Sequence, residues 1–308
     1  MNIVTAVIPV FRDADRAVNA ARAVTRCFSG AVSSFEVLVV DDGSADDTTH
    51  RLKEQLPSSV RLIQLTHNVG RAGARNAGAA EATGTFILFM DCDCLPADAN
   101  FVTAHLRRFE GDVVASTGPV VGTGSGFWHE HQVRSSAQRA RASARGFSAA
   151  GSTANLVVRR DVFLRVGGFN EVYRGYGFED RDLLMRIGQQ GTIAWTGDAV
   201  VEHHDELDLA TVCRKMREAG AHGARTFAVQ HPEAYRYLGY ASMDARLHPL
   251  RGRVARIFEP LQQPLLALTS KFLERRCLPF ALRSFMVRAL SGYSYLLGTR
   301  EATGMPQQ

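Results

Sequence analysis

The first hundred residues alternate between short apolar runs and longer stretches with a helical pattern. The apolar runs cover residues 4–9, 36–40, 60–65 and 85–90. The stretches between them, about residues 14–28, 46–55 and 70–83, predict helices. Strands separated by helices of this length indicate parallel βαβ units, in which helices cover both faces of a sheet. We therefore predict an α/β fold whose first part is a nucleotide-binding half-domain.

Two aspartates, Asp91 and Asp93, directly follow the last of these apolar runs. The carboxyl ends of strands in an open α/β sheet are where ligands usually bind. Carboxylates so close in sequence repel each other unless a cation or hydrogen-bond donors neutralise them, which favours a divalent metal site. A solvated turn is the alternative, because aspartate is common in turns.

Other polar and aromatic side chains follow the earlier strands and are expected at the same edge of the sheet. Phe11 could lie against a flat base, and Asp41 and Asp42 are acceptors suited to an imide N–H or a ribose hydroxyl. Arg71 and Arg75 begin the Ala/Gly-rich helix, where cation and helix dipole can both face an anion. Each signal is weak alone, since Asp-Asp-Gly-Ser is also a common helix cap.

A pair of acids, Glu179 and Asp180, opens a predicted helix in the second half of the chain. Asp180 shares a helical stripe with Leu183, Leu184 and Ile187, so its carboxylate should point into the protein. Desolvation there would raise its basicity, as a general base requires. Glu179 lies about a quarter-turn away and could hold a substrate hydroxyl. The alternative is that both acids only favour the helix dipole.

The net charge of +5 is concentrated near the end of the chain. Between residues 246 and 300, ten Lys/Arg oppose Glu259 and Glu274, which gives this stretch a charge of +8. Three prolines at 260, 264 and 279 should break it into short helices. The charge suggests peripheral contact with an anionic membrane through residues 246–300. Within it, an apolar stripe from Leu282 to Leu297, interleaved with Arg283 and Arg288, suggests an interfacial helix. Packing of this helix on its own domain is an equal alternative.

Cysteine use and hydropathy indicate a cytoplasmic protein, with the inner face of the cell membrane as a place of association. The five cysteines are odd in number and scattered, and Cys92 and Cys94 have no second pair to complete a zinc site. The sequence contains neither a visible signal peptide nor a clear membrane-spanning stretch. The basic tail lacks interleaved aromatic residues over most of its length, so no nucleic acid partner is expected.

Taken in order, six motifs resemble the family 2 glycosyltransferases, whose fold is called GT-A. The motifs are Ile8-Pro9-Val10-Phe11, Val40-Asp41-Asp42-Gly43-Ser44, Asn68 through Ala74-Arg75-Asn76, Asp91-Cys92-Asp93, Gly167-Gly168-Phe169 and Glu179-Asp180. The resemblance covers roughly residues 1–230. It implies a nucleotide-sugar-binding half over 1–110, an acceptor and catalytic half over 111–230, and a basic, amphipathic helical region over 231–308. Arg12 and Cys92 depart from the usual pattern without affecting the match.

The resemblance also implies roles for individual residues. Pro9 and Asp42 would contact the nucleobase of the donor, assisted by Arg71, and Asp91 would lie near the ribose. Metal ligation is implied for Asp93 and for a histidine beyond the Glu-Asp pair. His203 is favoured for that ligand over its neighbour His204, because alternate residues of a strand face opposite ways. Asp180 would be the catalytic base, and Glu179 would bind the acceptor.

The predicted function is therefore inverting, metal-dependent sugar transfer in the synthesis of surface polysaccharide, glycolipid or lipid-linked glycan. The cofactor would be Mn²⁺ or Mg²⁺. The favoured donor is a UDP-sugar, with a GDP- or dTDP-sugar as the alternative. The acceptor would be a glycan or a lipid-linked sugar. A sugar-nucleotide nucleotidyltransferase is an alternative, although residues 9–13 lack the glycine-rich basic loop that handles a triphosphate. A non-catalytic sugar-nucleotide-binding protein of the same fold is another.

Overall fold

The computed structural model describes residues 4–31, 34–275 and 277–302, so Arg276 of the basic tail lies outside the described residues. The chain divides into two compact units. The first contains residues up to 124, 132–171 and 180–205, and the second contains 125–131, 172–179 and the chain from 206 onward. The predicted domain boundary after residue 230 stays a prediction.

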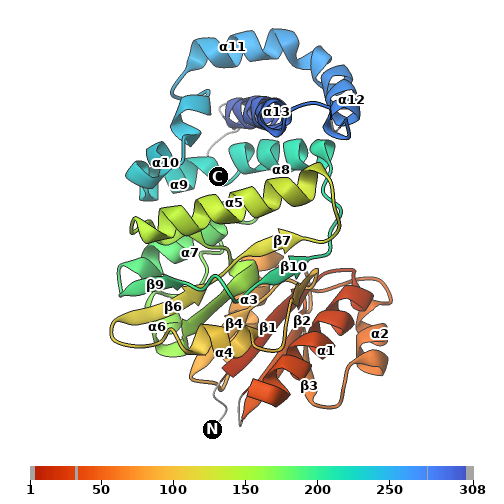
Figure 1. Ribbon diagram of the computed structural model, residues 1–308, viewed down its shortest axis with the longest axis vertical. Helices are drawn as coiled ribbons and strands as arrows, with labels where there is room; N and C mark the ends of the chain where they lie inside the picture. The colour runs from red at the N-terminus through yellow and green to blue at the C-terminus, as the bar shows by residue number, and fades with distance from the viewer. Residues whose placement is uncertain (1–3, 32–33, 276, 303–308) are drawn as a thin grey trace. The chain divides into compact units, whose positions relative to one another are not determined.

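The first unit is built on a seven-stranded sheet with the strand order β3-β2-β1-β4-β8-β6-β9 (Figure 1). Four parallel strands form one half, and β8 lies antiparallel between β4 and β6, which in turn pairs parallel with β9. The strands are β1 (Val4–Val10), β2 (Phe35–Asp41), β3 (Val60–Gln64), β4 (Phe86–Phe89), β6 (Val113–Thr117), β8 (Leu156–Arg159) and β9 (Thr192–Trp195). A second sheet has the order β5-β10-β7, with β5 (Cys94–Pro96), β7 (Val120–Gly122) and β10 (Val201–His203).

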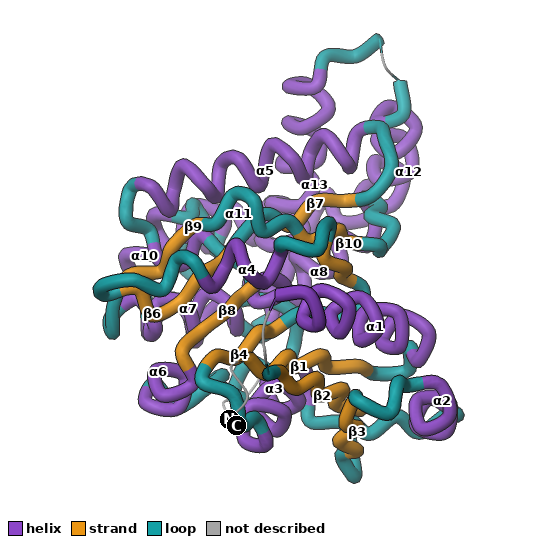
Figure 2. The backbone as a smooth tube through the Cα atoms, turned by 60° about the horizontal axis from the view of Figure 1, so that its bottom comes forward, coloured by secondary structure: helices purple, strands orange, loops and turns teal. Residues whose placement is uncertain are grey.

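Alternation along each strand sends side chains to two separate cores. Ile8 and Val39 join one cluster with α1 (Ala14–Ala31) and α4 (Phe101–Leu106). Val7 and Leu38 join the other, with α3 (Gly70–Glu81), α6 (Arg160–Arg165) and α7 (Glu179–Gly188). Figure 2 shows α1 and α3 on opposite sides of β1. Helices on both faces explain why these strands are apolar throughout.

The elements predicted for the first half are present, with small shifts at their ends. The helix α2 (Thr48–Gln55) completes the first half. After β5, the short helix α4 ends at Leu106. A longer helix, α5 (Phe127–Ala144), follows β7.

The second unit is helical. It contains α8 (Leu209–Ala221), α9 (Ala224–Gln230), α10 (Pro232–Tyr237), α11 (Pro249–Phe258), the short η4 (Glu259–Leu261), α12 (Gln262–Leu273) and α13 (Phe280–Glu301). Glycine allows α8 and α13 to pack closely, because a Cβ on Gly298 would lie 1.9 Å from the carbonyl oxygen of Arg217. The Arg217 side chain then pairs with Glu259 at 2.6 Å and with Glu301.

Two expectations for the tail are wrong. Pro264 does not break a helix, because it lies in the first turn of α12, where a backbone N–H has no intrahelical partner. Arg283 is buried and donates to the carbonyl of Leu273 at 3.0 Å, so it is no part of a solvated basic face. α13 packs against α8, and of its predicted stripe Leu282, Phe285 and Ala289 are exposed. Among the described residues, no helix has the length and apolar character needed to cross a membrane.

Candidate active site

The loop after β1 places Phe11 and Arg12 at the surface. Pro9 is half-buried at the end of the strand, and Phe11 is 42% exposed. The Arg12 guanidinium lies 4.9 Å from the centre of the Phe11 ring, and its backbone N–H donates to Ser44 Oγ at 2.9 Å. The Phe11 ring is thus exposed at this edge of the sheet, and its contact with a nucleobase stays a prediction.

The two acids after β2 are both turned inward. Asp41 is fully buried and accepts hydrogen bonds from the Ser44 N–H at 3.1 Å and from the Thr49 hydroxyl. Asp42 is 4% exposed and accepts from the N–H groups of Val69 and Gly70 at the start of α3. Burial raises the pKa of Asp42 above its usual value despite these two donors. Both carboxylates therefore shape the loops of this edge.

Arg75 links the Asp91 triplet to the predicted base. Its side chain is only 2% exposed. One guanidinium nitrogen donates to Asp91 Oδ1 at 2.5 Å, and the other lies 3.7 Å from Asp180 Oδ1. Arg75 was expected to face a donor phosphate, but in the structure it neutralises these two carboxylates. Arg71, one turn earlier on α3, is exposed.

Asp180 is held by α7 and by the segment before β8. The Thr153 N–H and the Ser152 hydroxyl donate to Asp180 Oδ2 at 3.1 and 3.3 Å, and the Thr153 hydroxyl donates to Oδ1. Burial would raise the pKa of Asp180, but the charge of Arg75 and the Thr153 hydrogen bonds outweigh it and lower the pKa. The prediction of a raised pKa for Asp180 is therefore wrong, since the groups that lower this pKa come from distant segments.

The helix stripe behind Asp180 is as predicted. Leu183, Leu184 and Ile187 are fully buried, while the Asp180 side chain keeps 27% of its surface exposed. Glu179 is the first residue of α7 and is 5% exposed. Asp180 therefore lies at the edge of the core, with one side open.

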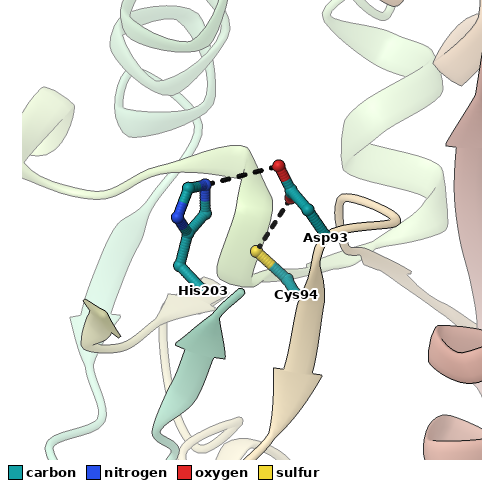
Figure 3. A group of neighbouring side chains, drawn as sticks. All are labelled: Asp93, Cys94 and His203. Atoms are coloured by element: carbon teal, nitrogen blue, oxygen red, sulfur yellow. Dashed lines mark hydrogen bonds and ion pairs between the residues drawn. The ribbon is translucent and has the colours of Figure 1, made fainter. Parts of the chain in front are cut away.

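Asp93, Cys94 and His203 form the group best suited to a metal ion among the described residues (Figure 3). Their ligand atoms lie within 4.8 Å of one another. The pairing of β10 with β5 sets His203 opposite Cys94, and His203 Nε2 reaches to 3.4 Å from Asp93 Oδ2. Cys94 is fully buried, with its sulfur 3.5 Å from Asp93 Oδ1.

His204 points away from this group. Its side chain pairs with Glu202 at 3.5 Å, and only its backbone N–H contacts Asp93, at the carbonyl oxygen. The strand alternation used in the sequence argument thus brings His203, and not His204, to Asp93.

The donor set fits a divalent cation. Carboxylate oxygen and imidazole nitrogen are common ligands of such ions. Burial pushes the pKa of Asp93 upward, but the hydrogen bond and charge of His203 outweigh burial and hold it at about 2. His203 Nδ1 is buried without a hydrogen-bond partner among the described residues, so this nitrogen could still form one further hydrogen bond or metal bond.

The Gly167-Gly168-Phe169 motif is clamped by Asn76 of α3. Asn76 accepts from the Phe169 N–H at 2.8 Å and donates to its carbonyl at 2.9 Å. A Cβ on Gly168, whose φ is 68°, would lie 2.7 Å from Asn76 Oδ1, so only glycine fits. The clamp holds the Phe169 ring 5.3 Å from the Arg75 guanidinium.

Sequence reasoning missed three contributors to this site: Ser152, Thr153 and Cys94. The first two anchor Asp180 from 27 or more residues away, and no local pattern marks them. Cys94 had a weak signal as a neighbour of the acidic triplet, but its partner is His203 and not Cys92.

Comparisons with known proteins agree with these features. Residues 5–167 match the family described as Glycosyl transferase family 2. A pre-mycofactocin glycosyltransferase of Mycobacterium tuberculosis is 29% identical over 240 residues, which are 75% of this chain and 48% of that protein. A succinoglycan biosynthesis protein of Rhizobium meliloti is 40% identical over 90 residues, or 29% of this chain and 25% of that protein. The chain spans about half or less of the length of these relatives.

The structural comparison concerns the fold alone. A mannosyltransferase from Pyrobaculum calidifontis, solved in complex with GDP-Man and Mn²⁺, is similar with a TM-score of 0.61 and 19% sequence identity. The match covers 94% of this chain and 85% of that one. It confirms the predicted GT-A type of α/β fold, with a mostly parallel sheet flanked by helices.

Proposed function

Since the chain belongs to glycosyl transferase family 2, we propose that it transfers a sugar from a nucleoside-diphosphate sugar to an acceptor hydroxyl with inversion at the anomeric carbon. The observation that carries the proposal is the Arg75 bridge. It joins Asp91, on the predicted donor side, to Asp180, the predicted base. One buried cation thus contacts both the acid proposed to bind the ribose and the acid proposed to accept the proton.

The donor would bind along the edge formed by the loops after β1, β2 and β4. Phe11 offers an exposed ring to the nucleobase, beside Pro9, and Arg71 offers a cation to the diphosphate. Asp41 and Asp42 act by holding the loops in shape, and Asp91 would accept from the ribose with its remaining oxygen. The complex of the similar mannosyltransferase with GDP-Man makes GDP-sugars candidates beside UDP- and dTDP-sugars.

Asp93 and His203 would hold the divalent cation, Mn²⁺ or Mg²⁺, with Cys94 beside them. Such an ion neutralises charge that develops on a departing nucleoside diphosphate.

Asp180 would take the proton of the attacking hydroxyl on a carboxylate oxygen. Its lowered pKa keeps it ionised at neutral pH, which is the form that can accept a proton. The Thr153 and Ser152 hydrogen bonds fix the carboxylate, and Glu179 at the start of the same helix would bind the acceptor. The acceptor is proposed to be a glycan or a lipid-linked sugar.

The test combines turnover with donor binding. Asp180→Asn should reduce transfer by at least about a hundredfold, the lower range for loss of a general base, while donor binding is retained. Asp161→Asn is the matched control, because it is the same substitution on an exposed aspartate. Wild-type turnover in Asp180→Asn would show that the base is misassigned.

A screen of nucleoside diphosphates and their sugars, with and without Mn²⁺, identifies the donor. A ligand that binds the folded state raises the melting temperature in proportion to occupancy. Product analysis then separates the alternatives. Release of a nucleoside diphosphate supports sugar transfer, release of pyrophosphate indicates a nucleotidyltransferase, and binding without turnover indicates a non-catalytic protein.

A further inference from the structure

The outward face of α11 and η4 carries five large apolar side chains that are at least half exposed. They are Leu250 (73%), Val254 (53%), Ile257 (73%), Phe258 (52%) and Leu261 (51%), called here the outer stripe. The next helix, α12, adds Leu265 and Leu268 at 45% and 53%. Contiguous apolar surface of this kind is uncommon on soluble monomers and marks an interaction site.

The orientation of α11 is fixed by its opposite face. Gly252 and Ala255 are buried, and the Ala255 carbonyl accepts from the Tyr293 hydroxyl of α13 at 2.6 Å. At about 100° per residue, Gly252 lies roughly opposite the middle of the outer stripe, and Ala255 lies about 120° from it. The helix therefore cannot hide the stripe by rolling without losing its packing on α13 (Figure 1).

Basic residues border the stripe. Arg251 and Arg253 project to either side of it on the helical wheel, and Arg256 follows on the flank of Arg253. All three are exposed. Arg253 and Arg256 form no ion pair with any residue that the structure describes, so no described acid neutralises their charge. Apolar residues flanked by arginines are typical of a helix that lies in the boundary layer of a membrane.

The charge argues against a second copy of the chain as the occupant. In a two-fold interface the same patch faces itself, so arginines would lie near arginines. An anionic bilayer, by contrast, offers hydrocarbon to the stripe and negative headgroups to its borders.

We propose that the outer stripe, with Arg251, Arg253 and Arg256, docks the protein on an anionic membrane surface. The sequence expectation placed membrane contact within residues 246–300 and the interfacial helix on the stripe of α13. There Arg283 is buried, and the basic apolar surface lies on α11 instead. The proposal does not depend on the proposed sugar transfer, because its test needs no substrate.

The experiment is flotation of the full chain with vesicles of phosphatidylcholine alone or mixed with phosphatidylglycerol. The wild type should float with the mixed vesicles at low salt and lose binding as salt rises. Ile257→Asp should weaken binding at least about tenfold, because burial of one such side chain is lost. Val229→Asp is the matched control: Val229 is 75% exposed and lies on α9.

A second pair of variants separates charge from apolar contact. The double variant Arg253→Gln/Arg256→Gln should weaken binding to the mixed vesicles about 25-fold, because each lost arginine should weaken it roughly fivefold. The control, Arg107→Gln with Arg225→Gln, removes the same charge from exposed positions elsewhere.

Three results would overturn the proposal. The first is that the wild type fails to bind mixed vesicles at low salt. The second is that the control variants lose as much binding as the stripe variants. The third is that the wild type sediments as a dimer without lipid and that Ile257→Asp converts it to a monomer. This result would make the stripe an interface between copies.

Discussion

Replacing Arg75 by methionine should destabilise the protein through two carboxylates at once. The guanidinium is 2% exposed and contacts Asp91 at 2.5 Å and Asp180 at 3.7 Å. Methionine fills much of the same space but brings no charge and no donors. Asp91 and Asp180 would then face each other across an apolar side chain with no counter-charge.

The expected loss is about 3 kcal/mol in the free energy of unfolding at pH 7. Removing one partner of a buried ion pair costs about 3–5 kcal/mol. The lower end applies because Asp91 and Asp180 keep 34% and 27% of their side-chain surface exposed, and water can solvate them in part. A domain stable by about 5–15 kcal/mol would remain folded after this loss.

The effect should also depend on pH. In the wild type, Arg75 lowers the pKa of Asp180, so this carboxylate stabilises the fold at neutral pH and loses that contribution as pH falls. Without Arg75, burial favours the protonated acid, and the unpaired charge destabilises the fold at neutral pH only. The difference between wild type and Arg75→Met should therefore shrink as pH falls from 7 to about 4.

Denaturant unfolding at several pH values measures these differences. Arg165→Met is the matched control, because Arg165 and Asp161 form an exposed pair at 3.0 Å that should contribute about 1 kcal/mol or less. Adding Asp180→Asn to Arg75→Met should recover part of the loss, since one of the two charges is removed. A loss equal to that of Arg165→Met, unchanged with pH, would refute the bridge.

Three further predictions concern metal binding, pH stability and helix packing. His203→Ala should weaken Mn²⁺ binding more than about tenfold by calorimetry without donor, whereas His204→Ala should leave it nearly unchanged; equal effects would contradict the assignment. Burial lowers the pKa of His105 to about 4, below the unfolded value of about 6.5. Stability should therefore fall by about 3 kcal/mol as pH drops between these values, and His105→Gln should flatten this dependence in denaturant melts. Gly298→Ala should destabilise the fold by about 1–3 kcal/mol in the same assay, because its Cβ would meet the Arg217 carbonyl; unchanged stability would contradict that close packing.

Local patterns were sufficient for the α/β half of the fold. The strands β1, β2 and β4 are mainly apolar runs, because both of their faces are covered by helices, whereas the edge strand β3 is partly exposed. The tail was harder to interpret. Its apolar and basic residues fit either an interfacial or a packed helix, and the choice depended on contacts such as Arg283 with Leu273.

The candidate site divides in the same way. The sequence by itself determined the order of the motifs and the acids at the ends of β2 and β4. It also determined the preference for His203 over His204, since alternation in a strand is a local property. Tertiary structure decided the state of those side chains. Asp41 and Asp42 turn inward to the loops, and Arg75 binds two acids instead of facing a phosphate.

The physical reason is that electrostatic state depends on neighbours that are distant in sequence. The pattern of its own helix predicted a raised pKa for Asp180, because the neighbours on the same helical stripe are all apolar. Thr153 and Arg75, which lower the pKa, arrive from 27 and 105 positions away, and only the folded chain brings them together. Residue type and strand order thus lie in the sequence, while charge, partner and basicity arise from the tertiary structure.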